Sequence, residues 1–139
     1  MNITVVGTGY VGLVTGTCFA NAGNDVMCLD VDTSKIEKLS KGESPFYEPG
    51  LSEMMLKCIE DDRLHFTCST TDAYEHADVV FICVGTPTGE NGECDLRHVY
   101  GVADDIASCS PKSSSPLVVV KSTVPVGTTQ KVAERLPNA

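Results

Sequence analysis

A glycine-rich segment between two short apolar runs constrains this chain more than any other feature. The run Ile3-Thr4-Val5-Val6 leads into Gly7-Thr8-Gly9-Tyr10-Val11-Gly12, and a second apolar run, residues 26–29, ends at Asp30. The first glycine permits a tight turn, the second lets a pyrophosphate approach the backbone, and the third lets a helix pack closely on the strand. This spacing predicts a strand–turn–helix–strand unit that binds a dinucleotide.

The residues around this loop also indicate which dinucleotide it would bind. The free N–H groups and the positive dipole end of the helix would face the phosphates, so no Lys or Arg is needed there. Asp30 follows Gly12 by 18 residues, at a position where a carboxylate can accept hydrogen bonds from the adenosine ribose. The same carboxylate would repel the 2′-phosphate of NADP, and no arginine follows at 31–34 to receive one. We therefore expect NAD as the cofactor.

The composition of the chain limits the classes of protein to which it could belong. The 139 residues are 42% hydrophobic and 21% charged, as expected of a single soluble domain spanning residues 1–139. The net charge of -9 argues against a nucleic-acid or anionic membrane partner, which would require a basic face. The N-terminus lacks the basic residues of a signal peptide, and no apolar stretch reaches the roughly 20 residues of a membrane span.

The cysteines and histidines give no sign of a metal or catalytic cluster. Seven cysteines are spread along the chain without a CxxC pair, which fits a reducing, cytoplasmic compartment. Cys18, Cys28 and Cys83 fall in apolar patterns and are expected to be buried. The three histidines are scattered, so we expect no metal site and no catalytic histidine.

Apolar strand-like runs alternate with helix-like segments along the whole chain. This alternation predicts an α/β fold of the Rossmann-like, doubly wound type, with a mostly parallel sheet of five strands. Beyond the opening unit, strands are expected at 64–68, 79–84 and 117–120, the last two buried on both faces. The expected helices follow Gly12 and span 33–41, 51–59, 71–76, 95–108 and 127–136, with a turn at 111–116.

Two strand ends offer further candidate site residues, because ligands in such sheets gather at the carboxyl ends of the strands. Thr86 and Pro87 follow the fourth strand, where the alternative is a simple turn. Ser122 and Thr123 follow the fifth strand, where the alternative is the capped start of a helix. The segment that follows the fifth strand can both line the site and begin a helix.

Four segments together resemble the N-terminal domain of the UDP-glucose 6-dehydrogenase family. They are the glycine loop 7–12, Tyr47-Glu48-Pro49-Gly50-Leu51, Val84-Gly85-Thr86-Pro87-Thr88 and Lys121-Ser122-Thr123-Val124-Pro125-Val126-Gly127. The resemblance spans nearly the whole chain. The wider group includes GDP-mannose and UDP-N-acetylmannosamine dehydrogenases, and the segment up to Asp95-Leu96 is most similar to the UDP-glucose branch.

The resemblance implies a role for each candidate residue. Gly7, Thr8, Gly9, Tyr10, Val11 and Gly12 would form the NAD pyrophosphate loop. Asp30 and Lys35 would contact the adenosine ribose. Thr86 and Pro87 would approach the cofactor from the fourth strand. Thr123 would lie near the nicotinamide and belong to the active site, helping to hold a catalytic water.

The resemblance also implies an activity and a longer enzyme. The family oxidises UDP-glucose to UDP-glucuronate with two NAD, through a cysteine thiohemiacetal and thioester, and a homodimer is expected. The nucleophilic cysteine and most of the sugar pocket would lie beyond residue 139, so we expect an N-terminal fragment, truncated before the last strand and inactive alone. The alternatives are another nucleotide sugar, GDP-mannose or UDP-N-acetylmannosamine, and a non-catalytic NAD-binding regulatory module.

Overall fold

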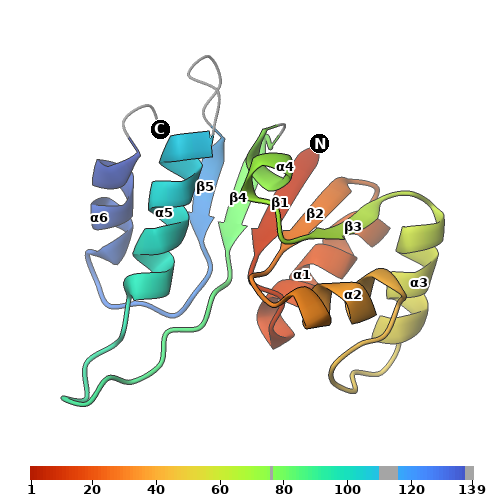
Figure 1. Cartoon of the computed structure of the whole chain (residues 1–139), viewed down its shortest axis with the longest axis horizontal. Helices are drawn as coiled ribbons and strands as arrows, with labels where there is room; N and C mark the ends of the chain where they lie inside the picture. Colours follow the sequence, from red (N-terminus) through yellow and green to blue (C-terminus); the bar gives the residue numbers. More distant parts are fainter. Residues whose placement is uncertain (76, 110–115, 137–139) are drawn as a thin grey trace.

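A single parallel sheet with helices on both faces forms the framework of the protein (Figure 1). The structure is a computed structural model, and it describes residues 1–75, 77–109 and 116–136. The strands are β1 (Asn2–Val6), β2 (Asp25–Leu29), β3 (Leu64–Thr67), β4 (Val79–Ile82) and β5 (Leu117–Val120). The helices are α1 (Tyr10–Asn21), α2 (Thr33–Ser40), α3 (Leu51–Glu60), α4 (Thr70–Tyr74), α5 (Arg97–Cys109) and α6 (Thr128–Arg135).

The strand order is β3-β2-β1-β4-β5, and every pair is parallel. Strands β2 and β3 therefore lie on one side of β1, and β4 and β5 lie on its other side. A crevice opens at such a switch point, beyond the carboxyl ends of β1 and β4. This order confirms the predicted Rossmann-like, doubly wound class. It also places the glycine loop after β1 beside the residues that follow β2 and β4.

Two apolar layers hold the helices on the sheet. One layer joins α1, α2 and α3 to one face, with Leu13, Leu39 and Met55 fully buried. The other joins α4, α5 and α6 to the opposite face, with Tyr74 and Ile106 in its interior. Alternation of side chains along β1 supplies both layers, because Val5 belongs to the first and Val6 to the second.

The predicted elements are observed, and the bounds of most differ from the prediction by one or two residues. Helix α5 begins at Arg97 and not at Asp95, because the Asp95 carboxylate accepts the Arg97 N–H at 3.0 Å and so lies before the first turn. Strand β4 ends at Ile82, two residues earlier than predicted. The predicted turn at 111–116 and the end of the predicted helix at residue 76 fall largely outside the described residues.

Strand β4 is covered on both faces, since Val80 and Ile82 pack in the layer of α5 while Phe81 packs on Phe19 of α1, but the prediction of burial on both faces is wrong for β5. In β4, Val80 and Ile82 are buried while Val79 and Phe81 are only half-buried, and Leu117 in β5 is exposed. The reason is the position of β5 in the sheet: within the described part of the chain β5 pairs only with β4, and its Val118 and Val120 pack in the layer of α5 and α6. A run of apolar residues does not distinguish such a strand from a fully covered one.

The burial predicted for the cysteines is correct for Cys28 and Cys83 and wrong for Cys18. Helix α1 buries Leu13, Gly16 and Ala20, which recur at helical spacing along one stripe. Cys18 lies off that stripe and is exposed. Burial raises the pKa of the Cys28 thiol to about 12 and that of Cys83 to about 11, so both remain protonated at neutral pH.

Candidate functional site

The glycine loop connects β1 to α1, and two of its glycines are fixed by packing. Gly7 has a φ of +96°, and a Cβ there would lie 2.7 Å from the carbonyl oxygen of Cys83 at the end of β4. A Cβ on Gly12 would lie 1.8 Å from the carbonyl oxygen of Gly7. The chain can therefore make this turn, with α1 against β1 and β4, only when neither position carries a side chain.

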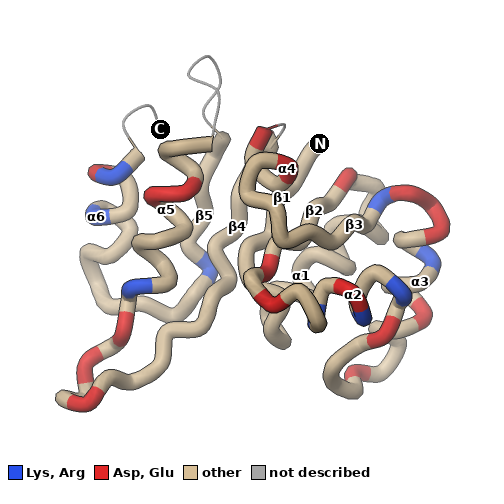
Figure 2. Tube along the Cα trace, viewed as in Figure 1, with Lys and Arg blue, Asp and Glu red and all other residues tan. Residues whose placement is uncertain are grey.

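Gly9 differs from the other two because no atom of the described residues lies within 4 Å of where its Cβ would be. It is the N-cap residue of α1, and no side chain in the part of the chain that the structure describes caps the free N–H groups of the first turn. Helix α1 contains no charged residue, and its trace in Figure 2 is tan, the colour of uncharged residues. The open position at Gly9 therefore adjoins unpaired N–H groups and the positive end of a helix dipole, an arrangement that favours an anion.

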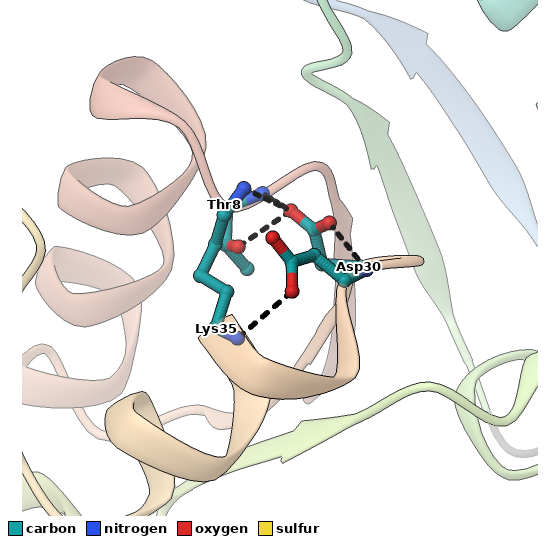
Figure 3. Close-up of polar contacts among 4 residues, drawn as sticks. Thr8, Asp30 and Lys35 are labelled. Carbon is teal, nitrogen blue, oxygen red and sulfur yellow. Dashed lines mark hydrogen bonds and ion pairs between the residues drawn. The ribbon is translucent and has the colours of Figure 1, made fainter.

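The carboxylate of Asp30, directly after β2, accepts four hydrogen bonds (Figure 3). Its Oδ2 accepts the Thr8 N–H at 2.9 Å, the Thr8 hydroxyl at 2.6 Å and the Lys35 ammonium at 3.1 Å. Its Oδ1 accepts the N–H of Asp32 at 3.1 Å. The Asp32 carboxylate in turn caps α2 by accepting the N–H of Lys35 at 3.1 Å. These contacts fix the carboxylate at the edge of the glycine loop.

The environment of Asp30 keeps it ionised. Partial burial alone would raise its pKa, but the hydrogen bonds from Thr8 and Asp32 and the Lys35 ammonium outweigh burial and lower the pKa to about 2. The side chain of Asp30 is 10% exposed, so these interactions are weakly screened. An ionised carboxylate is the form that accepts hydrogen bonds from sugar hydroxyls.

The lowered pKa of Asp30 predicts a pH dependence of stability. Because the folded-state pKa is below the ordinary value of 3.8, the stabilisation is fully present above about pH 4 and is lost as pH falls toward 2. The free energy of unfolding should lose on the order of 2 kcal/mol from this group over that interval. Urea denaturation at a series of pH values should show a shallower acid decline in Asp30→Asn than in the wild type. Equal declines in the two proteins would contradict the assignment.

A cavity of about 830 Å³ lies at the carboxyl ends of the central strands and brings most of the candidate residues together. Seven of the residues predicted to bind the cofactor line it: Gly7, Thr8, Gly9, Asp30, Lys35, Thr86 and Pro87. They come from the ends of β1, β2 and β4 and from α2, which are far apart in sequence. The volume falls within the range of small-molecule and cofactor sites.

Four predicted residues lie outside the cavity lining: Tyr10, Val11, Gly12 and Thr123. Tyr10 is exposed on the outer side of α1, where its hydroxyl donates to the Glu48 carboxylate and its ring packs 5.0 Å from that of Phe46. Thr123 is exposed beside the site, and its carbonyl oxygen accepts the Thr86 hydroxyl at 2.8 Å. The structure thus connects the β5 end to the cavity through Thr86.

Sequence reasoning missed one wall of the cavity, which is formed by α5. Arg97, His98, Gly101, Val102 and Asp105 line it from this helix. Their spacing of three and four residues puts them on one side of a helix, next to the stripe that buries Val99, Ala103 and Ile106. The spacing was visible in the sequence, but which side of α5 faces the strand ends depends on how the helix packs.

The charges near the cavity are mixed. Acidic residues mark the loop between β4 and α5, whereas both signs alternate along α2 and α3 (Figure 2). Within the ranges described by the structure, no three His, Cys, Asp or Glu side chains are grouped to hold a metal ion. Nor does any helix of residues 1–75, 77–109 and 116–136 have the length and apolar character to cross a membrane.

Comparison with known proteins gives the family. The model of the UDP-glucose/GDP-mannose dehydrogenase family, NAD binding domain, matches residues 1–139. UDP-glucose 6-dehydrogenase of Pseudomonas aeruginosa is 46% identical over 134 residues, covering 96% of this chain and 29% of that protein. UDP-glucose 6-dehydrogenase TuaD of Bacillus subtilis is 48% identical over 126 residues, covering 91% of this chain and 27% of that protein.

Solved structures agree with the sequence relatives. GDP-mannose dehydrogenase of Pseudomonas aeruginosa superposes with a TM-score of 0.92 at 38% identity, covering 98% of this chain and 31% of that one. UDP-D-ManNAc dehydrogenase of Pyrococcus horikoshii also has a TM-score of 0.92, at 32% identity, with 99% and 32% covered. The chain spans less than a third of each of these proteins. It belongs to the UDP-glucose/GDP-mannose dehydrogenase family, of which it is an NAD-binding domain.

Proposed function

We propose that the cavity at the strand ends holds NAD, and that the domain serves an enzyme oxidising UDP-glucose to UDP-glucuronate. The observation that carries this proposal is the convergence of the open Gly9 position and the Asp30 carboxylate on one cavity. These are the groups that a dinucleotide needs at its pyrophosphate and its adenosine ribose. When bound, NAD supplies the hydride acceptor, and the residues of this chain bind and orient it.

The remaining candidate residues take roles along the same cavity. Thr86 and Pro87 form the wall after β4, on the side away from Asp30 in the sheet order. Thr123 is proposed for the reacting end of the site, where its hydroxyl would help to hold a water. The hydrogen bond from Thr86 to the carbonyl of Thr123 supports this role, because it keeps the β5 end beside the β4 end.

Binding of NAD is tested by titrating this chain with NADH in a calorimeter or by fluorescence. We expect saturable binding of one NADH per chain, with weaker binding of NADPH because Asp30 faces the ribose position. Absence of binding at millimolar NADH would overturn the proposal. Equal affinity for NADPH would overturn the role of Asp30 in selecting NAD.

The choice of UDP-glucose as substrate follows from the relatives, since two proteins named UDP-glucose 6-dehydrogenase are 46% and 48% identical to this chain. The GDP-mannose dehydrogenase structure is 38% identical, which keeps GDP-mannose as the second candidate. The protein that carries this domain should be assayed for NADH formation with UDP-glucose, GDP-mannose and UDP-N-acetylmannosamine. We expect two NADH per UDP-glucose and little turnover of the others.

Faster NADH formation with GDP-mannose or UDP-N-acetylmannosamine than with UDP-glucose would show that the faster substrate, and not UDP-glucose, is the one oxidised. NAD binding without turnover of any of the three would favour the regulatory module. The homodimer and the cytoplasmic location expected from the sequence stay predictions. Sedimentation and cell fractionation of the same protein test them.

A further inference from the structure

Thr8 is the residue of the glycine loop whose surroundings fit a role other than direct cofactor contact. Its side chain is fully buried at the edge of the cavity, which Thr8 lines together with Gly7 and Gly9. Both polar hydrogens that Thr8 can offer, on its backbone nitrogen and its hydroxyl, are donated to one atom, Oδ2 of Asp30 (Figure 3). The hydroxyl is therefore already engaged before any ligand arrives.

The two oxygens of Asp30 are used unequally. Oδ2 accepts three hydrogen bonds, from the Thr8 N–H, the Thr8 hydroxyl and the Lys35 ammonium, which exceeds its two lone pairs. Among the described residues Oδ1 accepts only the Asp32 N–H. One lone pair of Oδ1 thus remains for a further donor. A sugar hydroxyl arriving at Asp30 would find its acceptor on Oδ1 and not on Oδ2.

We propose that Thr8 is a positioning residue, whose hydroxyl turns the Asp30 carboxylate so that Oδ1 receives a hydroxyl of the adenosine ribose. This inference rests on the proposed function, because it takes the ribose of NAD as the ligand at Asp30. It changes the role expected from the sequence, in which Thr8 itself would bind the cofactor. The contact joins the β1–α1 loop to the end of β2 across 22 residues of sequence.

Loss of the Thr8 hydroxyl alone should weaken the hydrogen bond between Asp30 and the adenosine ribose. In Thr8→Val, which has nearly the same shape, a methyl group would face Oδ2 where the hydroxyl now donates at 2.6 Å. The carboxylate would then turn toward its remaining donors and to solvent, and Oδ1 would leave its position. In Thr8→Ser the hydroxyl is retained, so the carboxylate should keep its orientation.

The test compares these two variants with two ligands: NAD, and an NAD analogue whose adenosine ribose lacks the 2′ and 3′ hydroxyls. We expect Thr8→Val to weaken NAD binding about tenfold, the size of one hydrogen bond to a charged group, and Thr8→Ser to stay within about threefold of the wild type. With the dideoxy analogue, Thr8→Val and the wild type should bind equally, since no ribose hydroxyl is present for Asp30 to accept.

Equal weakening of both ligands by Thr8→Val would show a purely structural role and overturn the inference while leaving NAD binding intact. Unchanged NAD affinity in Thr8→Val would overturn it as well. Failure of the wild type to bind NAD would instead overturn the proposed function, and this inference with it. Should Thr8→Val not fold, Thr8→Ala removes the hydroxyl without adding a branched side chain. Its affinities for NAD and for the dideoxy analogue are then compared in the same way.

Discussion

Replacing Asp30 with asparagine should weaken NAD binding by about one to two orders of magnitude, because a hydrogen bond to a charged acceptor contributes about 1.5–3 kcal/mol. The amide has one acceptor oxygen where the carboxylate has two, and the Thr8 donors compete for it. Lys35 would also lose its partner at 3.1 Å. Its freed ammonium should attract a 2′-phosphate, so the preference for NAD over NADP should narrow.

Isothermal titration with NADH and NADPH measures both effects. The matched control is Asp32→Asn, since Asp32 lies two residues away and its side chain caps α2 without contacting the carboxylate of Asp30. Asparagine caps helices as well as aspartate does, so this variant should bind NADH like the wild type. If Asp30→Asn bound NADH with wild-type affinity, or if both variants lost affinity equally, Asp30 would not be the ribose acceptor.

Alanine at Gly12 should destabilise the fold, whereas alanine at Gly9 should spare the fold and remove binding. A Cβ on Gly12 meets the backbone of Gly7 at 1.8 Å, and backbone cannot move aside as a flexible side chain can. We expect Gly12→Ala to cost about 3 kcal/mol, the upper part of the usual range for overpacking. Urea denaturation measures this loss.

The Gly9 position has nothing within 4 Å, and its φ of -71° suits alanine. Gly9→Ala should therefore unfold within about 1 kcal/mol of the wild type, the difference between the two residues at an N-cap. Its methyl group would stand where we place the pyrophosphate, so NADH affinity should fall at least about tenfold. Wild-type affinity in Gly9→Ala would contradict that placement, and wild-type stability in Gly12→Ala would contradict the packing account.

The parts of the fold that were predicted correctly depend on short stretches of sequence. The glycine pattern that such a turn requires lies within six residues, and Asp30 follows a strand that is visible in the sequence as an apolar run. Such features are readable without knowing the tertiary structure. The parallel, doubly wound class could be expected from the repeated alternation of strand and helix, since such units form right-handed crossovers.

The features that were missed depend on contacts between distant segments. The hydrogen bond from the Thr8 hydroxyl to Asp30 was not predicted, because it joins the glycine loop to the residue that follows β2. The exposure of Leu117 depends on which strand lies at the sheet edge, and the position of Gly101 in the cavity wall depends on the rotation of α5. An apolar pattern in the sequence predicts a helix or a strand, but it does not predict which other elements pack against it.

The central claim, that NAD occupies the cavity between the glycine loop and Asp30, is tested most directly by mapping the bound cofactor with amide NMR shifts. Titration of labelled protein with NAD should shift the amide signals of Gly7, Thr8 and Gly9, together with those of Asp30 and Gly85 at the ends of β2 and β4. Amides of α3, which contributes no residue to the cavity lining, should stay in place. Shifts confined to α3, or none at saturating NAD, would contradict the claim.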